Sequence, residues 1–149
     1  MRAVVQRAER ASVSVRGKNI ACIDEGLVVF LGVADDDTME DVDYLAEKIV
    51  GLRIFEDEEG KMNKSVQDVD GAVLIVSQFT LLGDVRKGRR PSFIKPAHPD
   101  KAQKLYDELV ETCKKKVKIV QRGQFQAAML VTVLNDGPVT ILLDSKKQF

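Results

Sequence analysis

The sequence predicts an α+β fold in which two main helices cover a mixed β-sheet. Two observations carry this prediction. Runs typical of strands fill both ends of the 149-residue chain, and only two segments between them have the 3.6-residue periodicity of amphipathic helices. No linker or low-complexity tract interrupts the chain, so residues 1–149 are expected to form a single domain.

The first third of the chain predicts strands. Ala3–Val5 is a short apolar run, and Ala11–Val15 alternates small polar and β-branched residues, as a half-buried strand does. After a turn at Gly17, Ile20–Asp24 is expected to return as a strand. The almost entirely apolar segment Leu27–Val33 is typical of a buried central strand.

The first predicted helix follows a polar break, with Thr38 as its N-cap and Asp41 as the acidic partner of a capping box. Its buried stripe consists of Val42, Leu45, Ile49 and Leu52. The charged segment Glu56–Lys61 is expected to be a loop.

The rest of the chain predicts a strand, a loop, a helix and three more strands. Ala72–Leu82 is typical of a second buried strand, and Gly83–Pro99 is expected to be an ordered loop. Pro99 opens the second helix, whose buried face consists of Ala102, Leu105, Leu109 and Cys113. The final strands are expected at Val117–Val120, Ala127–Leu134 and Val139–Leu143, with Asn135–Pro138 as a tight connection. Two helices leave a face or edge of such a sheet uncovered, so a homodimer is expected.

Composition and charge exclude several classes of function. Hydrophobic residues make up 44% of the chain and Trp is absent, so Val, Ile and Leu must fill the core. The 23 basic and 23 acidic side chains give a net charge of zero, whereas a general nucleic-acid coat should be basic. Any RNA contact must therefore come from a local patch, and DNA is not expected as a partner.

The sequence offers little classical catalytic chemistry. The single histidine, His98, lies just before a helix and is expected to be a surface residue, so no Ser-His or Cys-His pair is predicted. Cys22 and Cys113 have no partners at metal-ligand spacing, and neither a metal nor a cofactor is expected. The absence of a disulfide framework, of a signal peptide and of a membrane span favours the cytoplasm.

Two polar motifs interrupt the predicted strands, and each has two interpretations. Ser77-Gln78-Phe79-Thr80-Leu81 either alternates toward solvent or places polar groups at a sheet end, with Phe79 available to stack on a base. The motif at residues 135–140, Asn-Asp-Gly-Pro-Val-Thr, is either a plain hairpin turn or a fixed pair of carbonyl acceptors around a cis Gly137–Pro138 bond.

A basic segment lies between these motifs. Its cations are Arg86, Lys87, Arg89 and Arg90, with Lys95 close behind and Phe93 between them. The segment is either a solvated loop or a contact for RNA phosphates.

Taken together, these residues resemble the D-aminoacyl-tRNA deacylase family, also called D-Tyr-tRNA(Tyr) deacylase. The resemblance runs from end to end and includes both motifs at the family's order and spacing. The matching segments lie at residues 1–7, 11–15, 26–33, 52–55, 60–63, 77–81, 86–93 and 135–140. The chain departs from the family at Gln126, where Gly is usual, at Ala128, where Asp or His is usual, and at Ala8, where Val is more usual.

The resemblance implies barrel-like β layers and a homodimer whose active sites lie at the subunit interface. It implies a cis Gly137–Pro138 unit that reaches into the partner's pocket and rejects L-amino acids sterically, with Arg7 holding the loop. It implies that residues 77–80 line a pocket for the terminal adenosine, with Phe79 on adenine, and that Gln78 and Thr80 are the catalytic positions.

The implied activity is hydrolysis of the ester bond of D-aminoacyl-tRNA, a chiral proofreading step in translation quality control. Glycine mischarged on tRNA(Ala) is a further implied substrate. Since no side chain is evident as nucleophile and base, the ribose 2′-hydroxyl of the RNA is expected to assist, with a backbone amide near Thr80 as oxyanion donor.

Three other functions fit the sequence less well. A binding module would use Arg86–Arg90 and Phe79 without hydrolysing the ester, and a structural domain would not bind tRNA at low salt. An esterase of broad specificity would cleave L- and D-substrates at similar rates.

Overall fold

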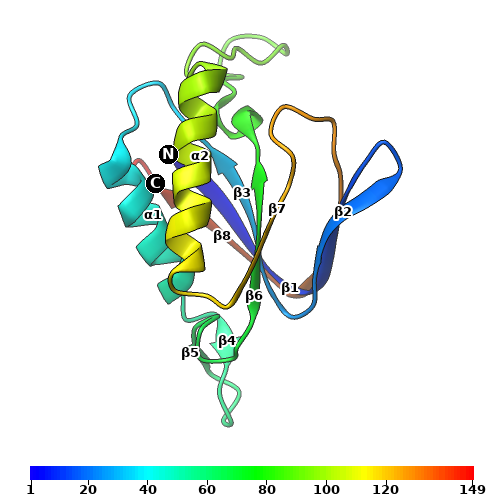
Figure 1. The fold of residues 1–149 in the computed structure, drawn as a ribbon. Coiled ribbons are helices and arrows are strands. Elements are labelled where there is room, and N and C mark those ends of the chain that lie inside the picture. The colour runs from blue at the N-terminus through cyan, green and yellow to red at the C-terminus, as the bar shows by residue number, and fades with distance from the viewer.

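The computed structural model describes all residues from 1 to 149 (Figure 1). The elements in chain order are β1 (Arg2–Val15), β2 (Lys18–Ile23), β3 (Gly26–Gly32), α1 (Met39–Gly51), β4 (Phe55–Glu56), β5 (Met62–Lys64), β6 (Ala72–Ser77), the 3-10 helix η1 (Phe79–Leu82), α2 (Pro99–Lys114), β7 (Ile119–Arg122) and β8 (Leu130–Asp144). Both helices and the mixed sheet were predicted, and the α+β class is confirmed. None of the helices is both long and apolar enough to cross a membrane.

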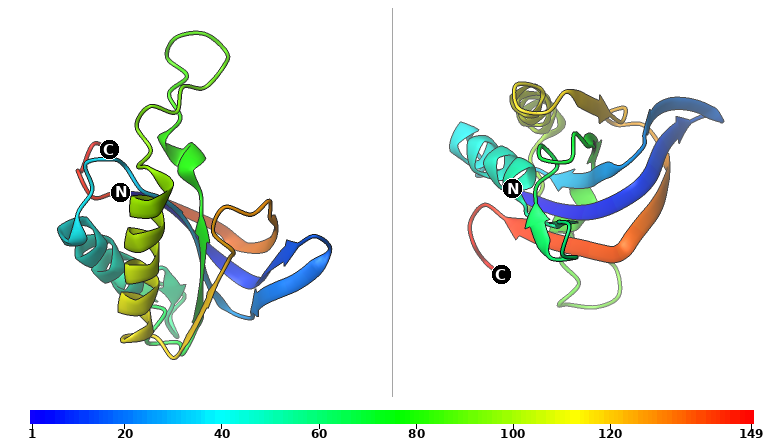
Figure 2. Two further views of the ribbon diagram at one scale, coloured as in Figure 1. Left: turned by 45° about the horizontal axis from the view of Figure 1, so that its top comes forward. Right: turned by 90° about the horizontal axis from the view of Figure 1, so that it is seen from below.

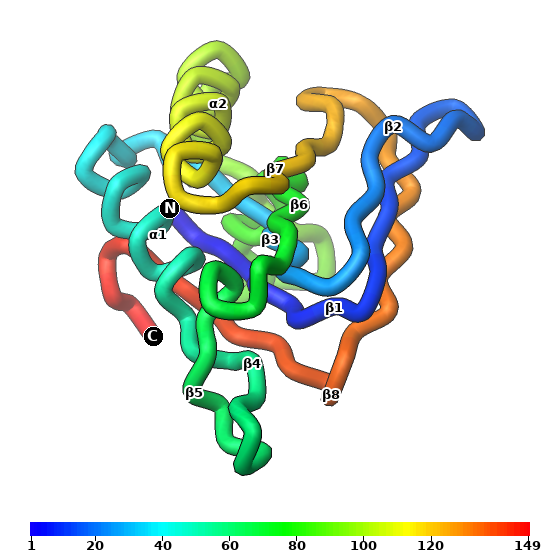
Figure 3. Tube along the Cα trace, turned by 60° about the horizontal axis from the view of Figure 1, so that its bottom comes forward, coloured from blue at the N-terminus to red at the C-terminus, as the bar shows by residue number.

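Strand β1 organises the sheet. It pairs antiparallel with β3 through its first half, with β2 through its second half, and with β8 along almost its whole length. Strands β3, β6 and β7 continue the sheet in parallel. The pairing of β1 with β8 shifts register on both sides of Ala8, and the sheet curves there into a nearly closed barrel (Figures 2 and 3).

The two faces of the sheet bury two separate apolar clusters. Helices α1 and α2 lie side by side on one face (Figure 1), over a cluster that includes Leu27, Val29 and Leu31 of β3. The opposite face buries Val28 with residues of β1, β2 and β6 inside the curve. Because successive side chains alternate across a strand, β3 must be apolar at every position to serve both clusters.

Three expectations from the sequence were wrong in detail. Residues 2–15 form one bent strand, not two, and Asn135–Pro138 does not reverse the chain but lies within the continuous strand β8. The strand expected at Ala72–Leu82 ends at Ser77, and the chain then turns into η1. The expected charged loop Glu56–Lys61 is confirmed, and it forms the tip of the short β4–β5 hairpin. In the first two cases the long pairing partner, β1 or β8, keeps the chain extended where local turn signals favoured a break.

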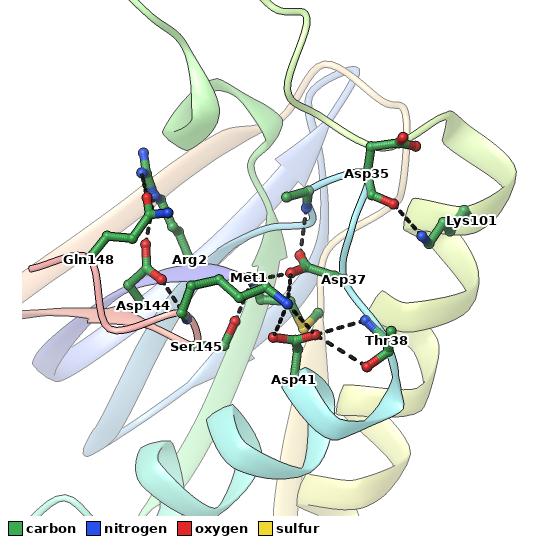
Figure 4. Close-up of polar contacts among 12 residues, drawn as sticks. Met1, Arg2, Asp35, Asp37, Thr38, Asp41, Lys101, Asp144, Ser145 and Gln148 are labelled. Atoms are coloured by element: carbon green, nitrogen blue, oxygen red, sulfur yellow. Dashed lines mark hydrogen bonds and ion pairs between the residues drawn. The ribbon is translucent and has the colours of Figure 1, made fainter.

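A buried polar cluster joins the two ends of the chain to the start of α1 (Figure 4). The α-ammonium group of Met1 donates to the Asp37 carboxylate at 2.5 Å and to the Ser145 hydroxyl at 2.6 Å, and both ionised partners are inaccessible to solvent. Asp41 accepts from the backbone N–H of Thr38 at 2.8 Å, as the predicted capping box requires. The cluster fixes the start of β1 and the end of β8 to the helical layer.

The Asp41 carboxylate is strongly held in its ionised form. Burial opposes ionisation, but hydrogen bonds from Ser145, Thr38 and Lys146 outweigh it and lower the pKa of Asp41 from 3.8 to about 2. The ammonium group of Lys146 lies 3.0 Å from this carboxylate. This cluster therefore stabilises the fold best above the ordinary pKa of an aspartate.

Candidate active site

A cavity of about 650 Å³ opens at the carboxyl ends of the parallel strands β3 and β6. Its walls come from the end of β6 and the start of η1, from the segment that enters α2, and from the turn between β7 and β8. Eleven of its 16 lining residues are hydrophobic, and the only polar side chains among them are Ser77, Gln78 and Gln126. Its size and apolar walls suit a small organic ligand such as a nucleoside.

Three of the four predicted pocket residues line this cavity: Ser77, Gln78 and Phe79. The backbone N–H of Gln78 donates to the carbonyl of Leu31 at 2.7 Å, which extends the β3–β6 pairing by one residue before η1 begins. A Cβ atom at Gly32 would lie 3.0 Å from the Gln78 carbonyl oxygen, so a glycine allows this close approach. The ends of two buried strands therefore set the position of the motif.

Thr80 lies outside the lining of the cavity. Its hydroxyl accepts a hydrogen bond from the side-chain amide of Gln78, and no acidic or basic side chain contacts it. Without a base, this hydroxyl has no means of becoming a nucleophile within the chain. The backbone N–H groups at the start of η1 are the remaining donors near this position, because the first residues of a helix lack intrahelical acceptors.

One exposed aromatic ring, that of Phe79, lines the cavity. Phe79 is 55% exposed and packs edge-to-face against Phe93 with ring centroids 5.0 Å apart. An exposed phenyl ring held by an aromatic neighbour offers a flat surface on which a base can stack.

Arg7, Gly137 and Pro138 form a second group, and none of them lines the cavity. The Gly137–Pro138 bond is cis, as expected, and Gly137 has a φ of +113°, which favours glycine. Arg7 is buried beneath this kink, with Nε 2.9 Å from the Asp136 carboxylate and Nη1 donating to the Ile54 carbonyl at 2.8 Å. The structure therefore brings Arg7 to residues 136–138, but it does not bring either to residues 77–80 of the same chain.

Asn135 closes the base of the kink. Its side-chain amide donates to the Arg7 carbonyl at 2.9 Å and to the Val139 carbonyl at 3.0 Å. A Cβ atom at Gly137 would lie 2.8 Å from Cγ2 of Val139 and 3.1 Å from Nη2 of Arg7. The Asn135 amide thus ties the kink both to β1 and to the residue after the Gly-Pro unit, and a side chain at Gly137 would crowd Val139 and Arg7.

The basic loop, residues 84–95, projects from the end of the molecule that carries η1 and the start of α2 (Figure 2, left). It is ordered at its base, where Asp84 and Ser92 exchange two backbone hydrogen bonds of 2.9 Å. Arg86 pairs with the Asp84 carboxylate and holds its pKa below the usual range. Three of the four predicted RNA-contacting cations, Lys87, Arg89 and Arg90, are exposed and form no ion pair.

The remaining candidate nucleophiles and bases are poorly placed for catalysis. His98 is exposed at the N-cap of α2, 3.7 Å from Asp100, as expected of a surface residue. Cys113 is fully buried in the core, and this burial raises the pKa of its thiol to about 12. Neither residue lines the cavity.

The sequence interpretation missed the wall formed by Phe125–Met129. Phe125 is anchored against the buried ring of Tyr106, with centroids 6.0 Å apart, and Gln126 has a left-handed φ of +58°. The only signal in the sequence was that this segment departs from the pattern of the family it resembles. That departure from the family pattern did not predict that the segment lines the cavity.

Comparison with known proteins agrees with these features. The model of the D-Tyr-tRNA(Tyr) deacylase family matches residues 4–144. Proteins named D-aminoacyl-tRNA deacylase from Clostridium novyi, Thermosipho africanus and Caldicellulosiruptor saccharolyticus are 56%, 59% and 60% identical to the chain, each over the full length of both sequences.

Two solved structures share the fold. One, titled c-Myc DNA Unwinding Element Binding Protein, is 43% identical with a TM-score of 0.92, and the match covers 97% of this chain and 98% of that one. The other is titled a probable eukaryotic D-amino acid tRNA deacylase, and it is 19% identical with a TM-score of 0.82 over 95% of this chain and 97% of that one. From the full-length matches in sequence and the shared fold, we conclude that this chain belongs to the D-Tyr-tRNA(Tyr) deacylase family of hydrolases.

Proposed function

We propose that this chain hydrolyses the ester bond between a D-amino acid and its tRNA, releasing both, and that glycine mischarged on tRNA(Ala) is a further substrate. The activity follows from membership of the deacylase family along the whole chain. The observation that carries the proposal is the cavity of about 650 Å³ lined by Ser77, Gln78 and Phe79, the motif in which the chain resembles the family. We place this activity in the cytoplasm, within a single domain of 149 residues.

The cavity is proposed to hold the terminal adenosine of the tRNA. Its walls are largely apolar, which suits the faces of a purine, and Phe79 stands at its rim with its ring exposed for stacking. The ester linkage then lies beside Gln78 and the first backbone N–H groups of η1.

Chiral selection is proposed to come from the partner subunit of a homodimer. Strand β8 pairs with β1 on one edge only, and its exposed face carries Leu130, Leu134 and Leu142, which a second copy can cover. In such a dimer, the Gly137–Pro138 kink reaches the partner's cavity, and its carbonyl oxygens surround the α-carbon of the amino acid. An L side chain collides with the kink, whereas a D side chain or the hydrogen of glycine fits.

The chemical step is proposed to depend on the RNA. The Thr80 hydroxyl has no base beside it, so water is the nucleophile, and the 2′-hydroxyl of the terminal ribose activates it. Water adds to the ester carbonyl, a backbone N–H near Thr80 stabilises the oxyanion, and the 3′-oxygen leaves with a proton. Gln78 orients the Thr80 side chain through their hydrogen bond.

The basic loop is proposed to contact the phosphates of the tRNA acceptor end. Lys87, Arg89 and Arg90 are exposed and without acidic partners, whereas Asp84 already neutralises Arg86. We therefore expect the first three to contribute more to the salt dependence of binding than Arg86 does.

A deacylation assay on matched D- and L-tyrosyl-tRNA tests this function, repeated with a D-substrate that lacks the terminal 2′-hydroxyl. The expected result is rapid cleavage of the D-ester only, and loss of cleavage on the deoxy substrate. Similar rates on both enantiomers indicate a broad esterase. Binding without cleavage indicates a nucleic-acid-binding module, and a DNA duplex is included as a competitor because one solved neighbour is named for binding a DNA element.

A further inference from the structure

Gln126 combines a left-handed backbone with a place in the cavity wall. Its φ is +58°, a conformation that a residue with a Cβ atom adopts only at a cost that glycine avoids. Glycine would therefore form the turn between β7 and β8 more easily than glutamine does. When a non-glycine residue adopts this costly conformation in the wall of a ligand cavity, its side chain is a candidate for a function in that cavity.

Of the other three non-glycine residues with left-handed φ, two have local explanations and the third lies near the end of the chain. Arg16 and Gly17 form the two-residue turn of the β1–β2 hairpin, which requires positive φ at both positions. Asp70, a residue type that tolerates this region, pairs with Lys118 at 2.7 Å, and Lys147 lies beyond β8 near the end of the chain. Gln126 forms no side-chain hydrogen bond within the protein and lines the cavity.

The surroundings of Gln126 leave its amide free to meet a ligand. Of the three polar side chains on the cavity wall, Gln78 is bound to the Thr80 hydroxyl, and Ser77 carries only a hydroxyl. The residues that follow Gln126 along the wall, Ala127, Ala128 and Met129, have no hydrogen-bonding side chains. Gln126 therefore supplies the only uncommitted group in the cavity that offers a donor and an acceptor in one plane.

We propose that Gln126 is a specificity-determining residue that pairs its amide with the hydrogen-bonding edge of the adenine in the cavity. The amide oxygen accepts from the exocyclic amino group, and the amide nitrogen donates to the adjacent ring nitrogen, as glutamine does elsewhere with adenine. The short side chain of Ala128 leaves space beside it. The inference rests on the proposed function for the identity of the ligand, but the base contact itself needs no ester chemistry.

The test compares D-tyrosyl-tRNA ending in adenosine with the same substrate ending in purine riboside, which lacks the exocyclic amino group. The wild-type protein is expected to prefer adenosine by roughly tenfold in kcat/KM, mainly through KM. In Gln126→Gly this ratio is expected to fall close to one, while the melting temperature rises because the backbone cost is removed. Gln126→Leu keeps the backbone cost but loses both the amide acceptor and the amide donor, and it is expected to lose the preference as well.

Arg16→Gly is the matched control, since it relieves the same backbone conformation in a hairpin turn away from the cavity. It is expected to raise the melting temperature without changing the ratio. Binding of adenosine monophosphate and of purine riboside monophosphate is measured in parallel, so the base contact is tested even if hydrolysis fails. A wild-type protein that does not discriminate between the two bases, or a Gln126→Gly variant that discriminates as well as the wild type, overturns the proposal.

Discussion

The cavity and the Gly137–Pro138 kink are positioned by different means. Two buried parallel strands fix the cavity, and its walls are complete within one chain. The kink lies on an edge strand and is held by a buried arginine, and it does not line this cavity. Under the proposed function, the cavity binds the substrate and the kink selects its enantiomer, so a second chain has to bring the two regions together.

The largest effect on activity is expected from Gly137→Ala, which changes the kink and leaves the cavity residues as they are. The added Cβ would meet Val139 at 2.8 Å and would sit at a φ of +113°. We expect the added Cβ to displace the kink by about 1 Å. This displacement should lower kcat/KM for D-tyrosyl-tRNA by on the order of 100-fold and reduce the preference for the D-substrate over the L-substrate. Steady-state assays on both enantiomers measure this, and an unchanged preference would show that the kink does not select.

Removal of the arginine beneath the kink is expected to affect stability as well. Arg7→Ala loses the hydrogen bond to the Ile54 carbonyl and the ion pair with Asp136, and should lower the free energy of unfolding by about 2 kcal/mol. Arg10→Ala is the control, because Arg10 is exposed and lies 3.7 Å from an exposed Asp24. Denaturant titration measures both, and equal losses would contradict the structural role assigned to Arg7.

Lowering the pH should reduce the free energy of unfolding of the fold that carries both regions. The pKa of Asp41 is about 2 in the folded state and 3.8 ordinarily, so its contribution is complete above pH 4 and disappears as the pH falls toward 2. At about 1.36 kcal/mol per pKa unit, that contribution is about 2 kcal/mol. Urea titrations of the wild type and Asp41→Asn should differ by this amount at pH 7 and converge near pH 2. A difference that persists at pH 2 would contradict the assignment.

A binding effect of intermediate size is expected in the cavity region. Phe79→Ala removes the exposed ring proposed to stack on the base, so KM is expected to rise roughly tenfold with little change in kcat. Because the ring is more than half exposed, the melting temperature should stay within a few degrees of the wild type. Phe79→Tyr retains the ring and serves as the control. A KM unchanged in Phe79→Ala would remove the stacking role.

The smallest effect is expected from Thr80→Ala. The hydroxyl has Gln78 as its partner and no base, so its loss is expected to reduce kcat only a few-fold, roughly the effect of one neutral hydrogen bond. Single-turnover rates with saturating protein measure the chemical step. Complete loss of turnover in a folded variant that still binds substrate would make Thr80 the nucleophile after all.

Much of the fold was predictable because its signals are local. Thr38 and Asp41 mark the start of α1, Pro99 opens α2, and the apolar run around Leu27 to Leu31 becomes the central strand. The errors occur where a distant partner overrides a local signal. Asn135–Pro138 has the composition of a turn, but pairing with β1 on either side keeps β8 continuous.

The candidate site was predictable only in part, for a similar reason. Ser77, Gln78 and Phe79 lie at the end of a recognisable buried strand, although that strand ends at Ser77 and not at Leu82 as the sequence indicated. The wall formed by Phe125–Met129 reaches the cavity only through the parallel pairing of β6 with β7, which leaves no periodic signal in the sequence. Nor does the sequence reveal that Gln126 has a left-handed φ, since glutamine is not a residue typical of that region.

The division of the site between two subunits is tested most directly by mixing two defective variants. Gly137→Ala keeps an intact cavity, and Phe79→Ala keeps an intact kink. If each site combines the cavity of one subunit with the kink of the other, random re-association makes half of the dimers mixed, each with one fully wild-type site. At a substrate concentration well below KM, the mixture should regain about a quarter of the wild-type rate on D-tyrosyl-tRNA. A rate no higher than the average of the two variants alone would contradict the shared site.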